Sequence, residues 1–140
     1  MREVESRAFL DSNVVLYLLS EDATRADAAE ALLKTRPVIS VQVLNEVTSV
    51  CRRKLKMAWN EIAQFLDPLR YFCEVVPLTV EVHDSARRIA ERHRLSFYDA
   101  CIVAAAVTAS CGTLYSEDMN RDQVMENNLT IRNPFGPRPG

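Results

Sequence analysis

Four acidic residues stand at places in this sequence where they could act together in catalysis. Asp11 follows a short apolar run, and Asp118 follows another one late in the chain. Glu46 has valines at helical spacing around it, and Asp99 comes just before a long apolar segment, where an uncompensated carboxylate is costly. Carboxylate oxygens suit Mg²⁺ or Mn²⁺ rather than zinc, and such ions activate water and stabilise the leaving oxygen in phosphodiester cleavage. Together the four acids favour metal-assisted hydrolysis.

Each of these acids also has a purely structural interpretation, which the sequence leaves open. Asp11 could cap a helix, Asp118 could cap a short turn, and Glu46 could face solvent. Asp99 could complete a capping box with Ser96, three residues earlier. Only the placement of all four acids at one expected site favours the catalytic interpretation.

Other common catalytic chemistries lack their residues. The two histidines, His83 and His93, fall in a charged helical stretch, where we expect them at the surface. The chain has only three glycines and no glycine-rich phosphate loop, and no GxSxG nucleophile motif occurs. The four cysteines form no CxxC pair and have no histidine at zinc-ligand spacing, so we interpret them as reduced core cysteines.

The elements that would position the acids are indicated by apolar periodicity and turn residues. In the second expected helix, Ala28, Ala31 and Leu32 should face inward, whereas the last helix is so apolar that it should be central and buried. The expected strands are residues 8–10, 38–40, 74–76, 113–115 and 129–131, and the expected helices are residues 14–19, 24–34, 41–54, 59–70, 79–92 and 96–110.

Strands and helices alternate along the whole chain. This order is typical of an α/β fold with a mainly parallel sheet covered by helices on both faces. The length of 140 residues, without a repeat or linker, predicts a single domain over residues 1–140 with an ordered core of about residues 7–135. In open parallel sheets, sites form beyond the carboxyl ends of the strands, where Asp11 and Asp118 would lie.

Charge and hydropathy bear on partners and location. The net charge of −2 does not by itself indicate nucleic-acid binding. Basic residues cluster at 52–56 and 87–94, where they could contact phosphates or be solvated helix ends. The charged first seven residues lack the apolar core of a signal peptide, and no apolar run approaches the length of a membrane span. We therefore expect a soluble, cytoplasmic protein with no membrane partner.

Around these acids the sequence resembles PIN-domain ribonucleases, specifically the VapC-type toxins of bacterial and archaeal toxin–antitoxin pairs. The resemblance covers essentially the whole chain, and residues 131–135 are also similar to the close of one branch of the family. The ordered set of segments, rather than any one of them, makes the resemblance specific. The segments are FLDSN at residues 9–13, SVQVLNE at 40–46, LSFYDA at 95–100 and LYSEDM at 114–119.

The resemblance implies a PIN-like three-layer α/β/α domain with a mainly parallel sheet of four to five strands. It further implies a divalent-metal-dependent endoribonuclease that hydrolyses RNA phosphodiesters with a metal-activated water. Asp11, Asp99 and Asp118 would be ligands of Mg²⁺ or Mn²⁺, and Glu46 would complete the catalytic set as a ligand or through water.

The supporting residues and partners are likewise implied by the resemblance alone. Ser116 and Asn13 would support the acidic pocket by hydrogen bonding. The partners would be an RNA substrate, a cognate antitoxin that occludes the site, and a second copy of the chain in a homodimer. The roles of Glu117 and Asp122, which lie beside Asp118, stay open, as does the number of metal ions.

Three competing functions differ in the residues that they require. A receiver-type phospho-switch needs a lysine at the end of a late strand, but no lysine follows Lys56. An aspartyl-phosphate phosphatase needs Asp-x-Asp after the first strand, and here Asn13 takes the place of the second carboxylate. A non-catalytic PIN-like module that binds RNA or protein remains the main alternative, although all four acids of the family are present.

Overall fold

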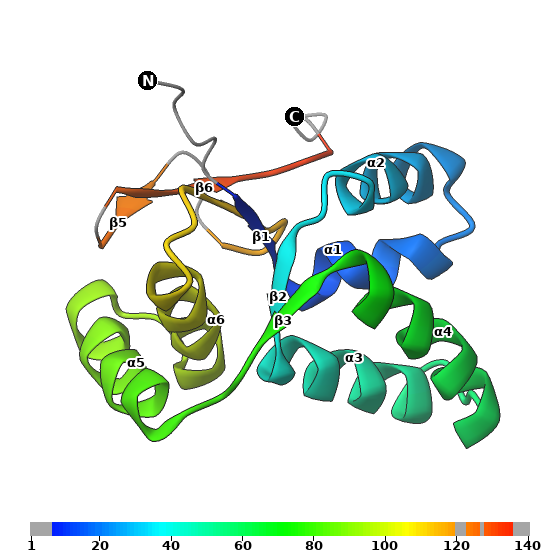
Figure 1. The fold of residues 1–140 in the computed structure, drawn as a ribbon, viewed down its shortest axis with the longest axis horizontal. Coiled ribbons are helices and arrows are strands. Elements are labelled where there is room, and N and C mark those ends of the chain that lie inside the picture. Colours follow the sequence, from blue (N-terminus) through cyan, green and yellow to red (C-terminus); the bar gives the residue numbers. More distant parts are fainter. Residues whose placement is uncertain (1–6, 120–122, 127, 136–140) are drawn as a thin grey trace.

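The structure is a computed structural model that describes residues 7–119, 123–126 and 128–135. Its strands are β1 (Ala8–Leu10), β2 (Val38–Ser40), β3 (Glu74–Val76), β4 (Thr113–Tyr115), β5 (Val124–Met125) and β6 (Leu129–Arg132). They form one six-stranded sheet in the order β3-β2-β1-β4-β6-β5 (Figure 1). All neighbours pair in parallel except β5, which is antiparallel to β6.

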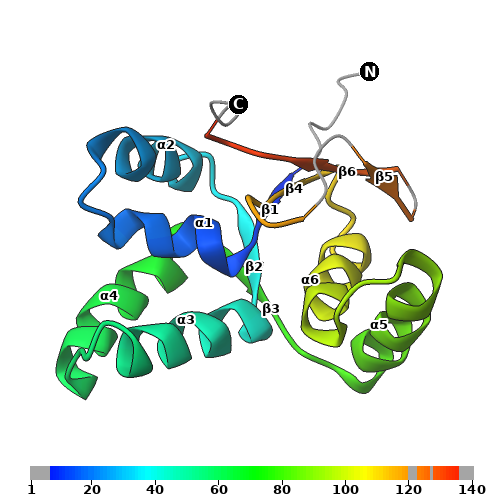
Figure 2. The same ribbon diagram turned by 180° about the vertical axis from the view of Figure 1, so that it is seen from behind.

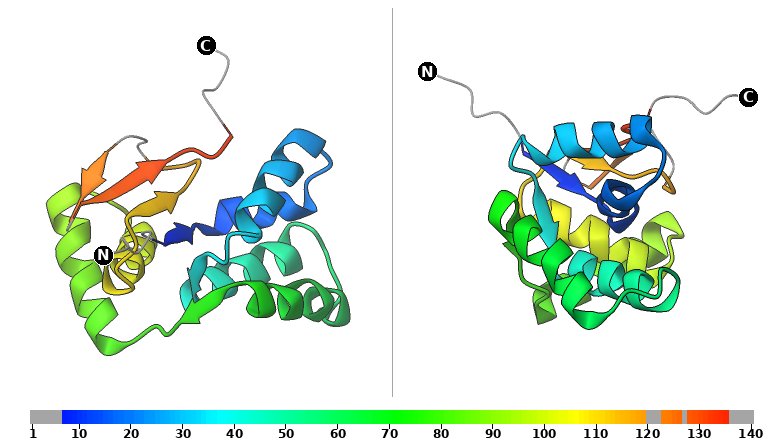
Figure 3. Two further views of the ribbon diagram at one scale, coloured as in Figure 1. Left: turned by 45° about the horizontal axis from the view of Figure 1, so that its top comes forward. Right: turned by 90° about the vertical axis from the view of Figure 1, so that its right-hand side faces the viewer.

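Helices lie on both sides of the central strands. They are α1 (Ser12–Leu16), the 3₁₀ helix η1 (Tyr17–Leu19), α2 (Ala23–Leu33), α3 (Val41–Arg53), α4 (Trp59–Phe72), α5 (Val80–His93) and α6 (Phe97–Thr108). Helices α5 and α6 lie together on one side, and α1 to α4 lie on the other (Figures 1 and 2). The left-hand view in Figure 3 shows the same division from another direction. No helix among the described residues has both the length and the apolar character needed to cross a membrane.

The strand pairing brings distant parts of the chain to one edge of the sheet. β1 lies between β2 and β4 and is parallel to both, with Leu10 opposite Tyr115. The backbone N–H of Asp11 donates to the carbonyl of Tyr115 at 3.0 Å. The residues that follow β1 and β4 therefore meet beyond the carboxyl ends of these strands, the usual place for a site in a parallel sheet.

Helix α6 forms the centre of the core. Residues 100–106 of this helix are all buried, as its continuous apolar sequence predicted. Four of these residues are alanines, whose small side chains allow close packing against α5 and the strands. The partly exposed first turn of α6 carries Asp99. A rigid, buried helix thus holds one of the four acids at its N-terminal end.

Short polar side chains begin the helices that follow strands or loops. Ser40, the last residue of β2, accepts a hydrogen bond from the N–H of Val43 and so starts α3 at the edge of the sheet. Ser96 accepts from the N–H of Asp99 at the start of α6. Caps of this kind satisfy backbone groups that the helix leaves unpaired, and they fix where the first turn begins.

The structure confirms the expected strands and the α/β class, and it corrects several details. The sheet has six strands rather than four to five, because the short strand β5 pairs with β6. The expected helix over residues 14–19 is α1 followed by η1. In α2, the buried residue is Ala29, whereas Ala31 is exposed and Ala28 and Leu32 are only partly buried. Alanines occur on several sides of this helix, so its inward face was ambiguous.

The structure confirms the expected positions of the cysteines and of His83 but not that of His93. All four cysteines are buried and free, as expected for reduced core cysteines. Burial raises the pKa of Cys73 to about 11, so this thiol is a poor nucleophile. His83 is exposed as expected, but the side chain of His93 is only 17% exposed and lies 3.7 Å from Glu126. The prediction of a surface position for His93 was therefore wrong.

The two basic clusters lie at the C-terminal ends of α3 and α5. Cations are favourable at this end of a helix because of the helix dipole. In the first cluster, Arg52 donates to the carbonyl of Met57 and lies over the ring of Trp59. This arrangement agrees with the interpretation of the clusters as helix ends. Residues 1–6 and 136–140, which flank the expected core of residues 7–135, lie outside the described residues.

Candidate active site

Asp11 is a buried carboxylate at the junction of β1 and α1. One of its oxygens accepts from the backbone N–H of Ser12 at 2.7 Å, which caps α1, and the other accepts from the hydroxyl of Ser116 at 2.8 Å. Only 4% of the residue is exposed. Burial raises the pKa of Asp11 to about 6, and the nearby charges of Asp99 and Glu46 act in the same direction. Asp11 is thus both a helix cap and an acid whose charged form is disfavoured by its surroundings.

Glu46, in the second turn of α3, points toward Asp11 rather than into solvent. Its Oε1 accepts from the hydroxyl of Ser12 at 2.7 Å, and its Oε2 accepts from the side-chain amide of Gln42 at 3.0 Å. Ser12 in turn lies beside Asp11. The hydroxyl of Ser12 therefore links two of the acids, and both oxygens of Glu46 have a fixed direction.

Asp99 lies in the first turn of α6 and is partly buried. Partial burial raises its pKa, and the charges of Glu46 and Asp118 raise it further, while a hydrogen bond with Ser96 acts in the opposite direction. The capping interpretation is therefore correct as far as the Ser96 hydroxyl is concerned, since it accepts from the Asp99 N–H. Asp99 nevertheless also belongs to the acidic group, because the charges of Glu46 and Asp118 act on its carboxylate.

Asp118 is the most exposed of the four acids and is held by Asn13. The side-chain amide of Asn13 donates to Asp118 Oδ2 at 2.9 Å, and the Asn13 carbonyl oxygen accepts from the backbone N–H of Glu117 at 3.3 Å. Ser116 accepts from the N–H of Met119 at 3.3 Å while it donates to Asp11. These contacts fix the loop after β4 against the start of α1.

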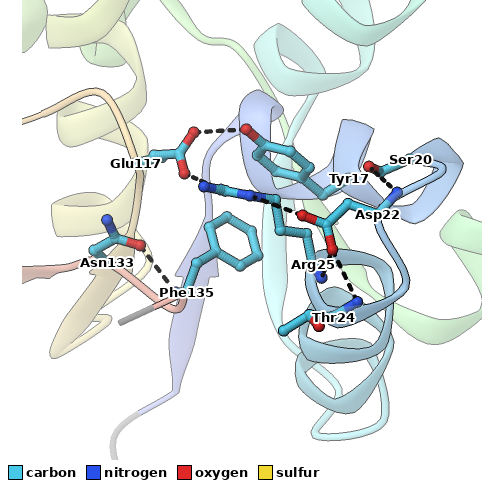
Figure 4. Close-up of polar contacts among 8 residues, drawn as sticks. All are labelled: Tyr17, Ser20, Asp22, Thr24, Arg25, Glu117, Asn133 and Phe135. Atoms are coloured by element: carbon cyan, nitrogen blue, oxygen red, sulfur yellow. Dashed lines mark hydrogen bonds and ion pairs between the residues drawn. The ribbon is translucent and has the colours of Figure 1, made fainter. Parts of the chain in front are cut away.

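The side chains of Glu117 and Asp118 have different partners. Its side chain turns toward α2, where it pairs with Arg25 and accepts from the hydroxyl of Tyr17 at 2.6 Å (Figure 4). Only 6% of the Glu117 side chain is exposed. Asp122, the other residue whose role the sequence left open, lies outside the described residues.

Two residues that hold the acids escaped the sequence analysis. Ser12 and Gln42 occurred there only within the segments that carry the family resemblance, without a role, whereas both donate hydrogen bonds to Glu46. Gln42 is buried and stands four residues before Glu46, which places both side chains on one face of α3. A glutamine among apolar residues, one turn before a candidate catalytic acid, was the signal that could have identified it.

The four carboxylates have a donor set that fits a hard divalent cation. Burial and mutual repulsion act on Asp11 and Asp99, which is the electrostatic situation that a bound cation relieves. Among the described residues, no ion pair joins any of the four to a lysine or arginine. Within the same residues, no three metal-binding side chains are gathered closely enough to hold an ion as they stand. An ion would therefore have to draw the carboxylates closer together.

A pocket of about 370 Å³ opens beside this group. Its polar lining includes Asn13 and Asp118, and its apolar lining includes Leu16, Leu19 and Val50 from α1, η1 and α3. Of the four acids, only Asp118 lines this pocket. The pocket is large enough for a planar ring or for a long side chain of a partner.

Three solved structures with similar folds match most of this chain. VapC20 of Mycobacterium tuberculosis, a toxin that cleaves the sarcin–ricin loop, is 22% identical with a TM-score of 0.64, over 79% of this chain and 89% of that one. A toxin–antitoxin complex from Klebsiella pneumoniae is 18% identical with a TM-score of 0.63, over 79% and 86%. VapBC2 of Rickettsia felis, bound to a promoter DNA fragment, is 20% identical with a TM-score of 0.62, over 90% and 97%.

At these identities the solved structures establish the fold alone, and the search of curated proteins found no match. The family assignment comes from the sequence. The family model for the PIN domain matches residues 8–125, a range that contains all four acids, both supporting residues and strands β1 to β5. The expected resemblance is confirmed at this level, and the chain belongs to the PIN-domain family.

Proposed function

We propose that this protein is a divalent-metal-dependent endoribonuclease, the toxin of a type II toxin–antitoxin pair. One observation carries the proposal. Asp11, Glu46, Asp99 and Asp118 form an electrostatically coupled acidic group at the carboxyl edge of a PIN-family sheet, without a cationic partner among the described residues. A functional site accounts for this accumulation of unpaired acids better than stability does.

The chain's own residues divide the work. Asp11, Asp99 and Asp118 would hold Mg²⁺ or Mn²⁺, which supplies positive charge to activate water and to stabilise the leaving oxygen. The hydroxyl of Ser116 orients Asp11, and Asn13 orients Asp118. Glu46, held by Ser12 and Gln42, would complete the ligand set or accept a proton from the attacking water.

The partners belong to the proposal as well. RNA is the proposed substrate because the sequence resembles PIN-domain ribonucleases, and VapC20, which shares the fold, is a toxin that cleaves the sarcin–ricin loop. A cognate antitoxin is proposed because the similar structures include a toxin–antitoxin complex. We further propose a cytoplasmic homodimer, in keeping with the family resemblance of the sequence.

Cleavage of RNA by the purified protein tests this function. Labelled structured RNAs are incubated with the protein and Mn²⁺, Mg²⁺ or EDTA, and the Asp99→Asn variant is compared with the wild type. The exposed Asp67 on α4 supplies a matched control, Asp67→Asn, which removes one carboxylate far from the site in sequence and element. We expect discrete cleavage that requires the metal and Asp99 but not Asp67. Full activity in Asp99→Asn would contradict the mechanism.

A second candidate is a non-catalytic PIN module that binds RNA or a protein. It is favoured by the finding that no three metal-binding side chains in the described part of the chain form a ready cluster. The same samples distinguish the two functions. A folded protein that neither cleaves RNA nor binds Mn²⁺ supports the module, whereas Mn²⁺ binding lost in Asp11→Asn and Asp99→Asn supports the nuclease.

A further inference from the structure

Glu117 stands between two residues of the candidate site, yet its side chain leaves in another direction. Ser116, on one side, donates to Asp11, and Asp118, on the other, accepts from Asn13. The Glu117 side chain is buried toward α2 and the C-terminal segment (Figure 4). The contacts that hold the Glu117 side chain therefore also affect the directions of the Ser116 and Asp118 side chains.

Both ends of Glu117 are fixed. Its backbone N–H donates to Asn13 Oδ1 at 3.3 Å. Its carboxylate accepts from the hydroxyl of Tyr17 through Oε1 and pairs with Arg25 through Oε2. A buried carboxylate with a cation and a hydroxyl as partners is well compensated. In this it differs from the four site acids, which form no ion pair with a lysine or arginine among the described residues.

Arg25 is itself enclosed by aromatic rings. Its guanidinium carbon lies 4.9 Å from the centre of the Tyr17 ring and 5.0 Å from that of Phe135. The two rings contact each other edge to face at a centroid distance of 4.6 Å. Such cation–π contacts hold a planar guanidinium in one orientation. Asp22, at the start of α2, lies 3.5 Å from the Arg25 Nε and fixes its other side.

We propose that Arg25 is a positioning residue of the active site, which anchors Glu117 so that Ser116 and Asp118 face Asp11 and Asp99. The anchor joins α2, η1, the loop after β4 and the C-terminal segment through Arg25, Tyr17, Glu117 and Phe135. Glu117 is then a structural anchor and not a further metal ligand. This inference rests on the proposed metal-dependent function for its catalytic consequence, but the anchoring itself does not.

The direction in which Arg25→Gln changes the Mn²⁺ affinity distinguishes a positioning role from a purely electrostatic one. Removal of a nearby positive charge should strengthen Mn²⁺ binding if Arg25 acts only through its field. If Arg25 acts by positioning, Arg25→Gln should weaken binding instead, because Asp118 loses its fixed place. Loss of residues that orient metal ligands typically weakens metal affinity about 10- to 100-fold, and we expect a loss in this range.

The test combines amide hydrogen exchange with Mn²⁺ titration for wild type, Arg25→Gln, Arg25→Lys and Glu117→Gln. Arg92→Gln is the matched control, since Arg92 also forms a long-range ion pair, with Glu126, that does not involve the loop after β4. In Arg25→Gln we expect faster exchange at the amides of Glu117 and Met119 and weaker Mn²⁺ binding. Arg25→Lys should show smaller changes in amide exchange and in Mn²⁺ affinity than Arg25→Gln does. Arg92→Gln should change neither the exchange of these amides nor the Mn²⁺ affinity.

The outcomes keep the two proposals apart. Unchanged exchange of the Glu117 and Met119 amides in a folded Arg25→Gln protein would overturn the anchoring, whatever the metal does. Equal or tighter Mn²⁺ binding by Arg25→Gln would overturn the positioning role. If Glu117→Gln abolished Mn²⁺ binding while the exchange of its loop amides stayed normal, Glu117 would be a metal ligand instead. Absence of Mn²⁺ binding in the wild type would contradict the proposed function. Hydrogen exchange at the Glu117 and Met119 amides would still show whether Arg25 anchors Glu117.

Discussion

Asp11→Asn should stabilise the protein in the absence of metal, although it removes a residue of the candidate site. Asp11 is buried and accepts hydrogen bonds from Ser12 and Ser116. Its burial, together with repulsion from Asp99 and Glu46, disfavours the charged form in the native state. Asparagine has nearly the same size and carries no charge, so it removes the electrostatic cost without leaving a cavity.

The magnitude follows from the pKa of Asp11, which rises from 3.8 to about 6 on folding. Each pKa unit corresponds to about 1.4 kcal/mol, so ionised Asp11 lowers the free energy of unfolding by about 3 kcal/mol. The native state binds this proton more tightly than the unfolded state does. The cost is therefore absent below about pH 4, grows as the pH rises to about 6, and is constant above it. Imperfect hydrogen bonding by asparagine costs about 1 kcal/mol, which leaves a net gain of about 2 kcal/mol.

Urea unfolding of wild type and Asp11→Asn in EDTA, from pH 4 to pH 8, measures this effect. The stability difference between the two proteins should grow in favour of the variant between pH 4 and 6 and then level off. Mn²⁺ should reverse the order, because only the wild type gains binding free energy, about 2.7 kcal/mol at a hundredfold excess over Kd. If the variant is less stable at pH 7.5 in EDTA, or the difference is independent of pH, the reasoning on Asp11 is refuted.

Three further predictions concern the same structure. Mn²⁺ affinity of the wild type, measured by titration calorimetry, should fall as the pH drops through about 6, because protonated Asp11 cannot ligate a cation; a flat profile from pH 7 to 5 would contradict this. Ser116→Ala should weaken Mn²⁺ binding roughly 10-fold and raise the pKa of Asp11 further, since the hydroxyl that stabilises its charge is lost; NMR titration of the Asp11 carboxyl carbon measures the shift. Ile102→Ala in the buried helix α6 should lower the free energy of unfolding by about 2–5 kcal/mol in urea melts, and a loss below about 1 kcal/mol would argue against a packed core there.

The fold could be predicted from sequence because its pattern is local. Each parallel strand is a run of three or four residues, and helices α3 and α5 follow β2 and β3 with their own polar caps, Ser40 and Thr79. Strand β5 was missed because two residues carry no periodicity, and its pairing depends on the neighbouring β6. Ala31 was wrongly expected to face inward from α2 because alanines give little contrast between the inner and outer sides of a helix.

The acids of the candidate site could be predicted from the sequence, but the residues that hold them could be predicted only in part. The four acids stood out because carboxylates beside apolar segments need compensation. The hydrogen bonds that hold Glu46 depend on the approach of α1 to α3 in space, so Ser12 carried no visible signal. Equally, the residues alone could not show that Glu117 has a different role from Asp118, because this depends on the position of Arg25, which pairs with Glu117 in space.

The most direct test of the central claim is anomalous diffraction from crystals of the protein soaked in Mn²⁺. The proposed function predicts an anomalous peak within coordination distance of Asp11 and Asp99 that disappears in crystals of Asp99→Asn. A peak located elsewhere, or no peak at Mn²⁺ concentrations that support RNA cleavage, would contradict the assignment of these carboxylates as the metal site.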